Sequence, residues 1–580
     1  MKKFTQIMAL LLALLLTFTS CTVGGEGDST ETTAPITTEA PTETPTEEPT
    51  EEPTEATTKE PEVIIEEPSY REKVSRTREE LEAMYNLVDE DFETLAAKLQ
   101  AFEDIALVSD DYDAVDAVYM EFEDFFYHVE TQITIANVIR YIDTTDEEAS
   151  NRYLDAYEKY GDIFNEYIEV CKAVYETSPI RDQLFEDWTE EEIKELFAYD
   201  PETQELREEN ERIQAEIEAL PEKEAYEKTP ALYAQMVVNY NKLAQLEGYD
   251  NYYDYASVEI YGRDYTKDDI ATFRTLVIDN IIAEFDEVGT RWAVLYQVLP
   301  QADFNIFYDL ALSPFDANKE NYFEGYINSY GDSSTGEGFR HLTENRNLIF
   351  ADSPNSHPSA FQTYFREFET PFCLFGSSGQ YTSAMVHEMG HYYAALYNPD
   401  VSSYDLAEVQ SQGNEMLFVK YMGGQVNRDI YKAFRGYSVF NFIYATMVGI
   451  IIDEFEQRVY SAENVENFTA EDFDAIMKEV CEQYGGFDFI KNNFGDMNEY
   501  WRMVAPTSAV YYVSYSMSAM AALSLLVTAE EDEAAAREMY RIIVEDVEED
   551  AAFMEAIAMA GLLSPFEEEV FKKVVQIAIE

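Results

Sequence analysis

Basic residues are scarce in this 580-residue chain, which has 39 lysines and arginines against 116 aspartates and glutamates and a formal net charge of −77. Nucleic acids bind to basic surfaces, and an anionic membrane repels an acidic one. The composition therefore excludes DNA or RNA as an expected partner, as well as electrostatic attachment to a membrane. We interpret the acidic residues as solvated helix faces that keep the protein soluble.

Cysteine is also scarce. Cys21 lies in the N-terminal segment, and the other three cysteines are Cys171, Cys373 and Cys481. These three are far apart and odd in number, so they allow at most one disulfide. Because a chain of this length buries a large core without such a crosslink, we expect all three to be buried apolar side chains.

Long apolar runs are few in the body of the chain. The strongest is YSVFNFIYATMVGIIID, residues 437–453. It is marginal in length for a membrane span and contains Asn441. We therefore predict a buried core helix rather than a membrane helix.

The first 21 residues have the features of a targeting segment. Lys2 and Lys3 follow Met1, residues 8–18 are almost entirely apolar, and Ser20 precedes Cys21. Small residues before a cysteine resemble the bacterial lipoprotein signal, in which Cys21 would carry the lipid; a secretory signal cut near Ser20 is the alternative. We expect the mature chain at the extracellular face of the bacterial cell membrane, which it would contact only through the lipid anchor.

The rest of the chain divides into a stalk and a body. Residues 22–69 are rich in threonine, glutamate and proline, and they have too few apolar side chains to offset the entropy of ordering, so we expect a disordered stalk. From about Tyr70 apolar residues recur at helical spacing, and few segments alternate with period two. FETPFCLFGSS, residues 368–378, is the best strand candidate. We predict a mainly α body with a small sheet.

The strongest chemical signal is the run His387-Glu388-Met389-Gly390-His391, which fits H-E-x-x-H. One helical turn separates residues i and i+4, so both imidazoles face the same side and can hold one Zn²⁺. Glu388 is then placed to act as general base on a water molecule. Histidine occurs only five times in the chain, which makes a chance match rare. A surface helix with two unconnected histidines is the alternative.

A catalytic zinc site needs a third protein ligand, and a carboxylate from a following helix often supplies it. YNPDVSSYD, residues 397–405, breaks the first helix, and LAEVQSQGNEMLF, residues 406–418, starts a second one that can fold back. We predict Glu408 as the third ligand, with a solvated acidic helix as the alternative. Ser411 and Glu415 share its face, and we expect them to support the ligands, although Glu415 could equally face water.

These motifs, in this order, resemble the M3 family of zinc peptidases, which includes thimet oligopeptidase and oligoendopeptidase F. HEMGH followed by AEVQSQGNE resembles the active-site helix and the glutamate-bearing helix of that family. TPFCLFGSSGQYTSAMV resembles its preceding strand and loop. Residues 246–266, LEGYDNYYDYASVEIYGRDYT, and residues 560–574, AGLLSPFEEEVFKKV, resemble further segments, so the resemblance covers nearly all of residues 70–580.

The resemblance implies a two-lobed helical ellipsoid with a deep central channel. Residues 70–345 would form an N-terminal helical lobe and residues 346–580 a catalytic lobe. It implies one Zn²⁺ at the channel floor, held by His387, His391 and Glu408. The implied activity is that of a zinc-dependent oligoendopeptidase, which hydrolyses short peptides rather than folded proteins.

The chain departs from the family in one feature. Members usually carry a histidine before a tyrosine-rich stretch downstream of the metal helix. Residues 501–523, WRMVAPTSAVYYVSYSMSAMAAL, contain Tyr511, Tyr512 and Tyr515, but no histidine follows His391. We predict that Tyr515, with Tyr511 or Tyr512, donates a hydrogen bond to the oxyanion that forms at the scissile carbonyl. An aromatic core helix is the alternative.

Two other functions fit the same residues. A metallocarboxypeptidase on this scaffold would need a cationic group for the free carboxylate of its substrate, such as Arg502. A non-catalytic surface lipoprotein that binds peptides or zinc would account for the missing histidine. In the enzyme readings the partners are oligopeptides, whose backbone could pair with the edge of the strand at residues 368–378. The oligomeric state stays open.

Overall fold

The computed structural model is mainly helical. It describes residues 69–186, 193, 201–218, 220–400, 403–548 and 550–579. The predicted signal segment with Cys21 and nearly all of the predicted stalk lie outside these residues. In the described part of the chain the strands form one three-stranded sheet, and the predicted fold class, mainly α with a small sheet, is confirmed.

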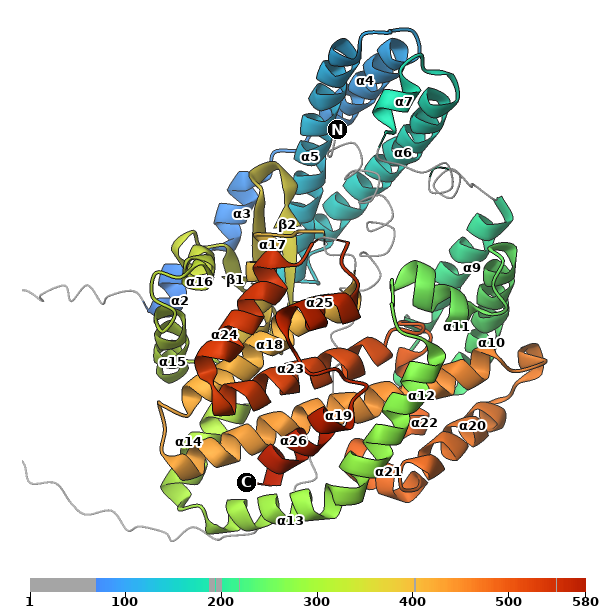
Figure 1. Cartoon of the computed structure of the whole chain (residues 1–580). Coiled ribbons are helices and arrows are strands. Elements are labelled where there is room, and N and C mark those ends of the chain that lie inside the picture. Colours follow the sequence, from blue (N-terminus) through green and yellow to red (C-terminus); the bar gives the residue numbers. More distant parts are fainter. Residues whose placement is uncertain are drawn as a thin grey trace, which may run out of the picture.

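The N-terminal helices are α2 (Tyr70–Val74), α3 (Arg78–Met84), α4 (Asp89–Ala106), α5 (Tyr112–Ile142), α6 (Glu147–Thr177) and α7 (Arg181–Leu184). Helices α4 to α7 form a bundle that projects from one end of the molecule (Figure 1). Leu95 and Leu99 of α4 share a core with Phe122 of α5 and Tyr167 of α6, and all four side chains are buried. The bundle therefore has a core of its own.

The middle of the chain contains α9 (Pro201–Glu218), α10 (Glu222–Leu246), α11 (Tyr252–Tyr255), the π-helix η1 (Ala256–Ile260), α12 (Lys267–Leu276), the π-helix η2 (Val277–Ile282), α13 (Ala283–Val298), α14 (Gln301–Leu312), α15 (Ala317–Asn328) and α16 (Ser334–Glu344). The main core draws on Val74 and on residues from 233 to 578. It therefore includes residues from both sides of position 345, where we predicted the lobes to divide, and that division stays a prediction.

The strands are β1 (Leu348–Phe350), β2 (Ala360–Phe365) and β3 (Thr370–Phe375), and the short 3-10 helix η3 (Arg366–Phe368) joins the last two. β3 lies in the centre of the sheet, parallel to β1 and antiparallel to β2. The strand predicted within residues 368–378 is confirmed, but β2 occupies one edge along its whole length and β1 occupies the other at residues 373–375. Our prediction that its edge pairs with substrate is therefore wrong, because an apolar run shows that a strand is buried and not which strands flank it.

The C-terminal part contains α17 (Thr382–Ala395), α18 (Tyr404–Met422), α19 (Arg428–Tyr460), η4 (Val465–Asn467), α20 (Ala470–Gln483), α21 (Phe487–Phe494), α22 (Met497–Val504), α23 (Val513–Glu531), α24 (Glu533–Arg541), the π-helix η5 (Ile542–Asp546), α25 (Phe553–Ala560) and α26 (Glu568–Ile579). Two of these, α19 and α23, are long and apolar enough to cross a membrane, but their apolar windows are 72% and 83% buried inside the protein. The core helix predicted at residues 437–453 lies within α19 and is confirmed.

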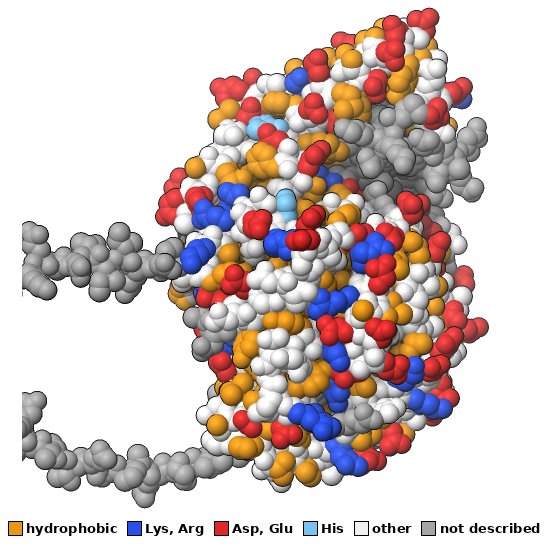
Figure 2. Space-filling model, turned by 60° about the vertical axis from the view of Figure 1, so that its left-hand side comes forward, with side chains coloured by type: hydrophobic (Ala, Val, Ile, Leu, Met, Phe, Trp, Pro, Cys, Tyr) orange, Lys and Arg blue, Asp and Glu red, His pale blue; other side chains and the backbone are white. Residues whose placement is uncertain are grey.

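Two further predictions concern single side chains. Cys171, Cys373 and Cys481 are free and buried, as predicted. On the face in Figure 2 the acidic side chains are scattered among basic and apolar ones rather than gathered into one patch. This distribution fits the interpretation of the acidic residues as solvated surface.

Candidate metal centre

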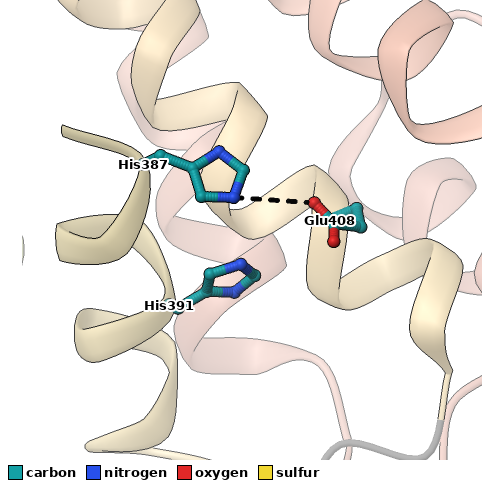
Figure 3. A group of neighbouring side chains, drawn as sticks. All are labelled: His387, His391 and Glu408. Carbon is teal, nitrogen blue, oxygen red and sulfur yellow. Dashed lines mark ion pairs between the residues drawn. The ribbon is translucent and has the colours of Figure 1, made fainter. Parts of the chain in front are cut away.

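Three predicted metal ligands lie together at the contact between α17 and α18. His387 and His391 project from successive turns of α17, and Glu408 faces them from α18 (Figure 3). One ligand atom from each residue lies within 4.8 Å of the other two. Nε2 of His387 is 3.7 Å from Oε2 of Glu408, and the two imidazole rings are 4.9 Å apart between centroids. α17 ends at Ala395 and α18 begins at Tyr404, and the second helix packs against the first, as the sequence predicts.

The two helices approach closely because residue 390 has no side chain. A Cβ atom on Gly390 would lie 2.6 Å from the carbonyl oxygen of Gln410 and 2.7 Å from Cα of Ser411. Asn414 of α18 is buried and donates to the carbonyl oxygen of Val386 at 2.7 Å. Neither Gly390 nor Asn414 was predicted to belong to the site. A glycine inside a predicted helix was the available signal, since glycine is unfavourable there without a packing reason.

A second layer of polar side chains contacts the three candidate ligands. Oε1 of Glu415 lies 2.8 Å from Nδ1 of His387. Ser411 is buried, donates to the carbonyl oxygen of Glu408 at 3.0 Å and lies 3.3 Å from Oε2 of that carboxylate. Glu415 therefore lies against a histidine rather than facing water. Both residues contact candidate ligands from the face of α18 that the helical spacing predicts.

Carboxylates and burial determine the protonation of this cluster. Burial disfavours the charged form of His387, but the hydrogen bond and charge of Glu415 and the charges of Glu408 and Glu388 outweigh it and raise the pKa of His387 to about 10. Burial and the charge on His387 lower the pKa of His391 well below its usual value. His391 is therefore neutral, with a lone pair available to a metal ion.

Glu388 and Glu408 hold protons more strongly than carboxyl groups in water do. Burial raises the pKa of Glu388 to about 7; His387 opposes that shift, and Glu408 and Glu415 add to it. Burial also raises the pKa of Glu408. A carboxylate with a pKa near neutrality is suited to accept and return a proton. The excess of negative groups around two imidazoles would also attract a cation.

The three predicted tyrosines lie at different places relative to this cluster. The hydroxyl of Tyr511 donates to Oε1 of Glu408 at 3.3 Å. The ring of Tyr515 packs against that of Tyr511, with centroids 5.1 Å apart. The ring of Tyr512 is buried beside Tyr500, and burial raises the pKa of its hydroxyl. The structure thus brings Tyr511 to a candidate ligand.

The other three histidines contact residues outside the candidate metal site. Nδ1 of His128 is 3.0 Å from Glu367, and Nδ1 of His341 is 2.7 Å from the hydroxyl of Tyr392. His357 packs against the ring of Tyr141.

Arg502 is buried, and its guanidinium donates to both carboxylate oxygens of Asp474 at 2.7 and 3.1 Å. Its plane lies over the ring of Tyr226, with Cζ 4.4 Å from the ring centroid. The positive charge of Arg502 is therefore already neutralised within the protein.

The residues of this cluster fit a divalent zinc ion. Two imidazoles and one carboxylate make up a His₂Glu set, which binds catalytic zinc and leaves one coordination position open. The second nitrogen of His387 has a carboxylate partner, as metal-bound histidines almost always have. The arrangement can therefore hold a Lewis acid next to a buried carboxyl group, Glu388.

Comparison with known proteins bears on the fold. No protein-family model and no curated protein sequence matches this chain. Solved structures do match, including one assigned as an oligoendopeptidase F (TM-score 0.64, 18% identity, 86% of this chain and 97% of the other). PZ peptidase A with an inhibitor matches at a TM-score of 0.61 and 19% identity, over 88% of this chain and 98% of the other.

A protein from Bacillus anthracis that is also assigned to oligoendopeptidase F matches at a TM-score of 0.59 and 17% identity, over 85% of this chain and 95% of the other. The matches extend over almost the whole length of each solved chain. This chain therefore has the fold of the oligoendopeptidase F and PZ peptidase structures.

Proposed function

We propose that this protein is a zinc-dependent endopeptidase that hydrolyses short peptides. The observation that carries the proposal is the meeting of His387, His391 and Glu408 beside the buried carboxyl group of Glu388. The likeness in fold to structures named for oligoendopeptidase F and PZ peptidase A supports the substrate class.

In the proposed mechanism His387, His391 and Glu408 hold the ion. Zinc, when bound, supplies Lewis-acid polarisation of the scissile carbonyl and lowers the pKa of a water molecule. Glu388 accepts a proton from the attacking water and passes it to the leaving amine, a role that suits a carboxyl group whose pKa lies near 7. The Glu415 carboxylate keeps the imidazole of His387 oriented through its 2.8 Å contact.

Tyr511 is the proposed donor to the oxyanion of the substrate. Its hydroxyl reaches Glu408, so it lies at the edge of the candidate site. Because a hydroxyl carries one hydrogen, Tyr511 would turn from Glu408 to the oxyanion and stabilise the developing negative charge in place of the histidine that the sequence lacks. Tyr515 packs on the ring of Tyr511 and supports it. For the peptide backbone we propose β2, a strand at the edge of the sheet, as the pairing partner.

The two alternative functions, a carboxypeptidase and a non-catalytic binding protein, require different features of the site. A carboxypeptidase needs a free cation for the terminal carboxylate, and Arg502, the residue we expected to supply it, is bound to Asp474. That contact favours the endopeptidase. A binding protein would have the same metal ligands but would not cleave peptides. A cleavage assay therefore distinguishes it from the endopeptidase.

A quenched fluorescent peptide with acetylated and amidated ends tests the proposal. We expect cleavage by the purified ectodomain, which is the chain without the predicted signal segment (residues 1–21). Cleavage should be lost with a chelator and recover with added zinc. Mass spectrometry of the products should show internal cuts. Release of single residues only from peptides with a free carboxyl end would support the carboxypeptidase, and zinc binding without cleavage would support the binding protein.

The ligand role of Glu408 has its own test. Glu408→Ala should remove most of the bound zinc, measured by metal analysis after dialysis. Glu482→Ala on the exposed side of α20 is the matched control and should keep the parental zinc content. Full metal occupancy in Glu408→Ala would remove this residue from the ligand set.

We also propose that Cys21 carries a lipid that anchors the enzyme at the extracellular face of the cell. Metabolic labelling with a fatty acid should mark the parent chain and not Cys21→Ala. Equal labelling of both chains would contradict the anchor and leave the peptidase proposal unaffected.

A further inference from the structure

The turn that carries Tyr511 contains an unusual backbone conformation. Val510, directly before Tyr511, has a φ of +62°. A β-branched residue rarely adopts this left-handed conformation, because its Cβ lies too close to the following carbonyl oxygen. Val510 is 1% exposed, so this turn is enclosed by other side chains. Such a residue persists only where its surroundings hold it in place.

Side chains from two distant segments hold this turn. Oε1 of Glu456 accepts from the N–H of Val510 at 3.0 Å. Arg263 Nη2 donates to the carbonyl oxygen of Val510 at 2.8 Å, and the hydroxyl of Tyr261 donates to the carbonyl oxygen of Ala509 at 2.7 Å. We call Tyr261, Arg263 and Glu456 the Val510 clamp. Its contacts fix both peptide groups of Val510, and therefore the rotation between them.

The clamp buries two ionisable side chains, which is costly unless they have hydrogen-bond partners. Glu456 is 0% exposed and lies on α19; Arg263 is 7% exposed and follows η1. Arg263 Nη2 also lies 3.1 Å from Oγ of Ser514 in the first turn of α23. Buried ionisable groups require hydrogen-bond partners, and here the main partners are backbone atoms of one turn. Burial raises the pKa of Glu456 well above its usual value, which favours a neutral acceptor.

The clamp acts on the candidate site through Tyr511. Rotation at Val510 would swing the following residue, and Tyr511 donates from its hydroxyl to Glu408 at 3.3 Å. The ring of Tyr261 also lies 5.9 Å from that of Tyr511, between centroids. We propose that Tyr261, Arg263 and Glu456 are positioning residues that hold Val510 left-handed and so keep the hydroxyl of Tyr511 at Glu408. The effect on turnover rests on the proposed function, whereas the effect on the place of Tyr511 does not.

The first test reports on Tyr511 without any assay of activity. The full ectodomain carries 3-fluorotyrosine at position 511, and fluorine NMR records its resonance. Glu456→Leu removes the acceptor and should shift or broaden the resonance. Glu456→Gln keeps an Oε1 acceptor and should leave it unchanged. Tyr261→Phe removes one donor by deleting a single hydroxyl and serves as a mild second variant, in which a smaller shift is expected.

A suppressor variant separates positioning from general stability. Glycine adopts positive φ without the crowding of a Cβ, so Val510→Gly should reduce the need for the clamp. In the double variant Glu456→Leu with Val510→Gly, the resonance should return toward the parental position. An unchanged resonance in folded Glu456→Leu and Tyr261→Phe would overturn the proposal. So would a disturbed resonance that Val510→Gly leaves disturbed.

The second test uses turnover of the capped peptide. Glu456→Leu should lower kcat about tenfold or more, because a displaced Tyr511 hydroxyl no longer stabilises the transition state. KM should change less than about twofold. Glu456→Gln should keep the parental kcat, and Val510→Gly should restore part of the loss in Glu456→Leu. A parental kcat in Glu456→Leu would overturn the link to turnover. If the parent itself cleaves no peptide, the proposed function fails, and the fluorine resonance still decides whether the clamp positions Tyr511.

Discussion

Nδ1 of His387 on α17 lies 2.8 Å from Oε1 of Glu415 on α18. A carboxylate at this place keeps a proton on Nδ1. Without a metal ion His387, whose pKa is raised to about 10, also holds a proton on Nε2, which lies 3.7 Å from Glu408; a bound metal ion would displace that proton. The contact joins the two helices that carry the candidate ligands. Glu415 and Glu408 thus face different nitrogens of the same imidazole.

The first prediction concerns this contact. Glu415→Gln keeps an acceptor beside His387 and removes the negative charge, so the imidazole becomes a weaker ligand. We expect zinc affinity to fall about 10–100-fold, measured by competition with a chromophoric chelator. Glu482→Gln, an exposed change on α20, is the control. Parental affinity in Glu415→Gln would show that the contact does not tune the metal site.

The second prediction concerns the general base. Glu388→Gln removes the group that accepts a proton and leaves His387 and His391 in place. We expect kcat to fall by about 10²–10⁴-fold while zinc content stays parental, measured by peptide turnover and metal analysis on the same sample. Turnover at the parental rate would assign the base elsewhere.

The third prediction concerns the close approach of α17 and α18. In Gly390→Ala the new Cβ would lie 2.6 Å from the carbonyl oxygen of Gln410, so the helices must separate and carry Glu408 away from the histidines. We expect weaker zinc binding and a loss of stability of about 1–3 kcal/mol, measured by zinc titration and by thermal unfolding of the metal-free protein.

The matched control for that prediction is Gly289→Ala in α13. A Cβ there meets no atom within 4 Å, and alanine favours a helix by up to about 1 kcal/mol. Its stability should equal or exceed that of the parent, with unchanged zinc affinity. Equal behaviour of the two alanine variants would contradict the steric argument.

The fourth prediction concerns the dependence of stability on pH. Glu130 of α5 is buried, and burial raises the pKa of its carboxyl group to about 7; Arg366 opposes that shift and Asp400 adds to it. Arg366 itself bonds to Asp400 at 2.8 Å, and the half-buried Tyr127 and the buried Tyr160 lie near this carboxyl group.

The raised pKa of Glu130 determines whether stability rises or falls with pH. Below about pH 4.5 Glu130 is protonated in both the folded and the unfolded chain. Between pH 4.5 and 7 the unfolded chain releases the proton while the folded chain retains it, so the folded state loses stability as pH rises. Above pH 7 the loss is complete, on the order of 3 kcal/mol.

Glu130→Gln should remove this contribution. We expect parent and variant to have similar free energies of unfolding near pH 4.5, and the variant to be more stable at pH 8. Urea unfolding at pH 4.5, 6 and 8 measures the difference. A difference that does not change with pH would show that Glu130 has an ordinary pKa in the folded protein.

The sequence determined those parts of the site that depend on short-range helix geometry. His387, Glu388 and His391 lie within about one turn of one helix, so their spacing alone places both imidazoles on one side. The break at residues 397–405 and the polar face of residues 408–415 predicted a returning helix with an acidic side chain. The apolar run at residues 437–453 predicted a core helix, because only a buried helix can be apolar on most of its surface.

Only the tertiary structure decided the contacts between residues far apart in the chain. Tyr511, and not Tyr512, contacts Glu408, which lies 103 positions earlier in the sequence. That contact depends on the packing of α18 and on the left-handed turn at Val510. The central place of β3 and the pairing of Arg502 with Asp474 likewise depend on neighbours from other segments. Local spacing carries no information about such neighbours, because burial and long-range packing select among side chains that look equivalent along the chain.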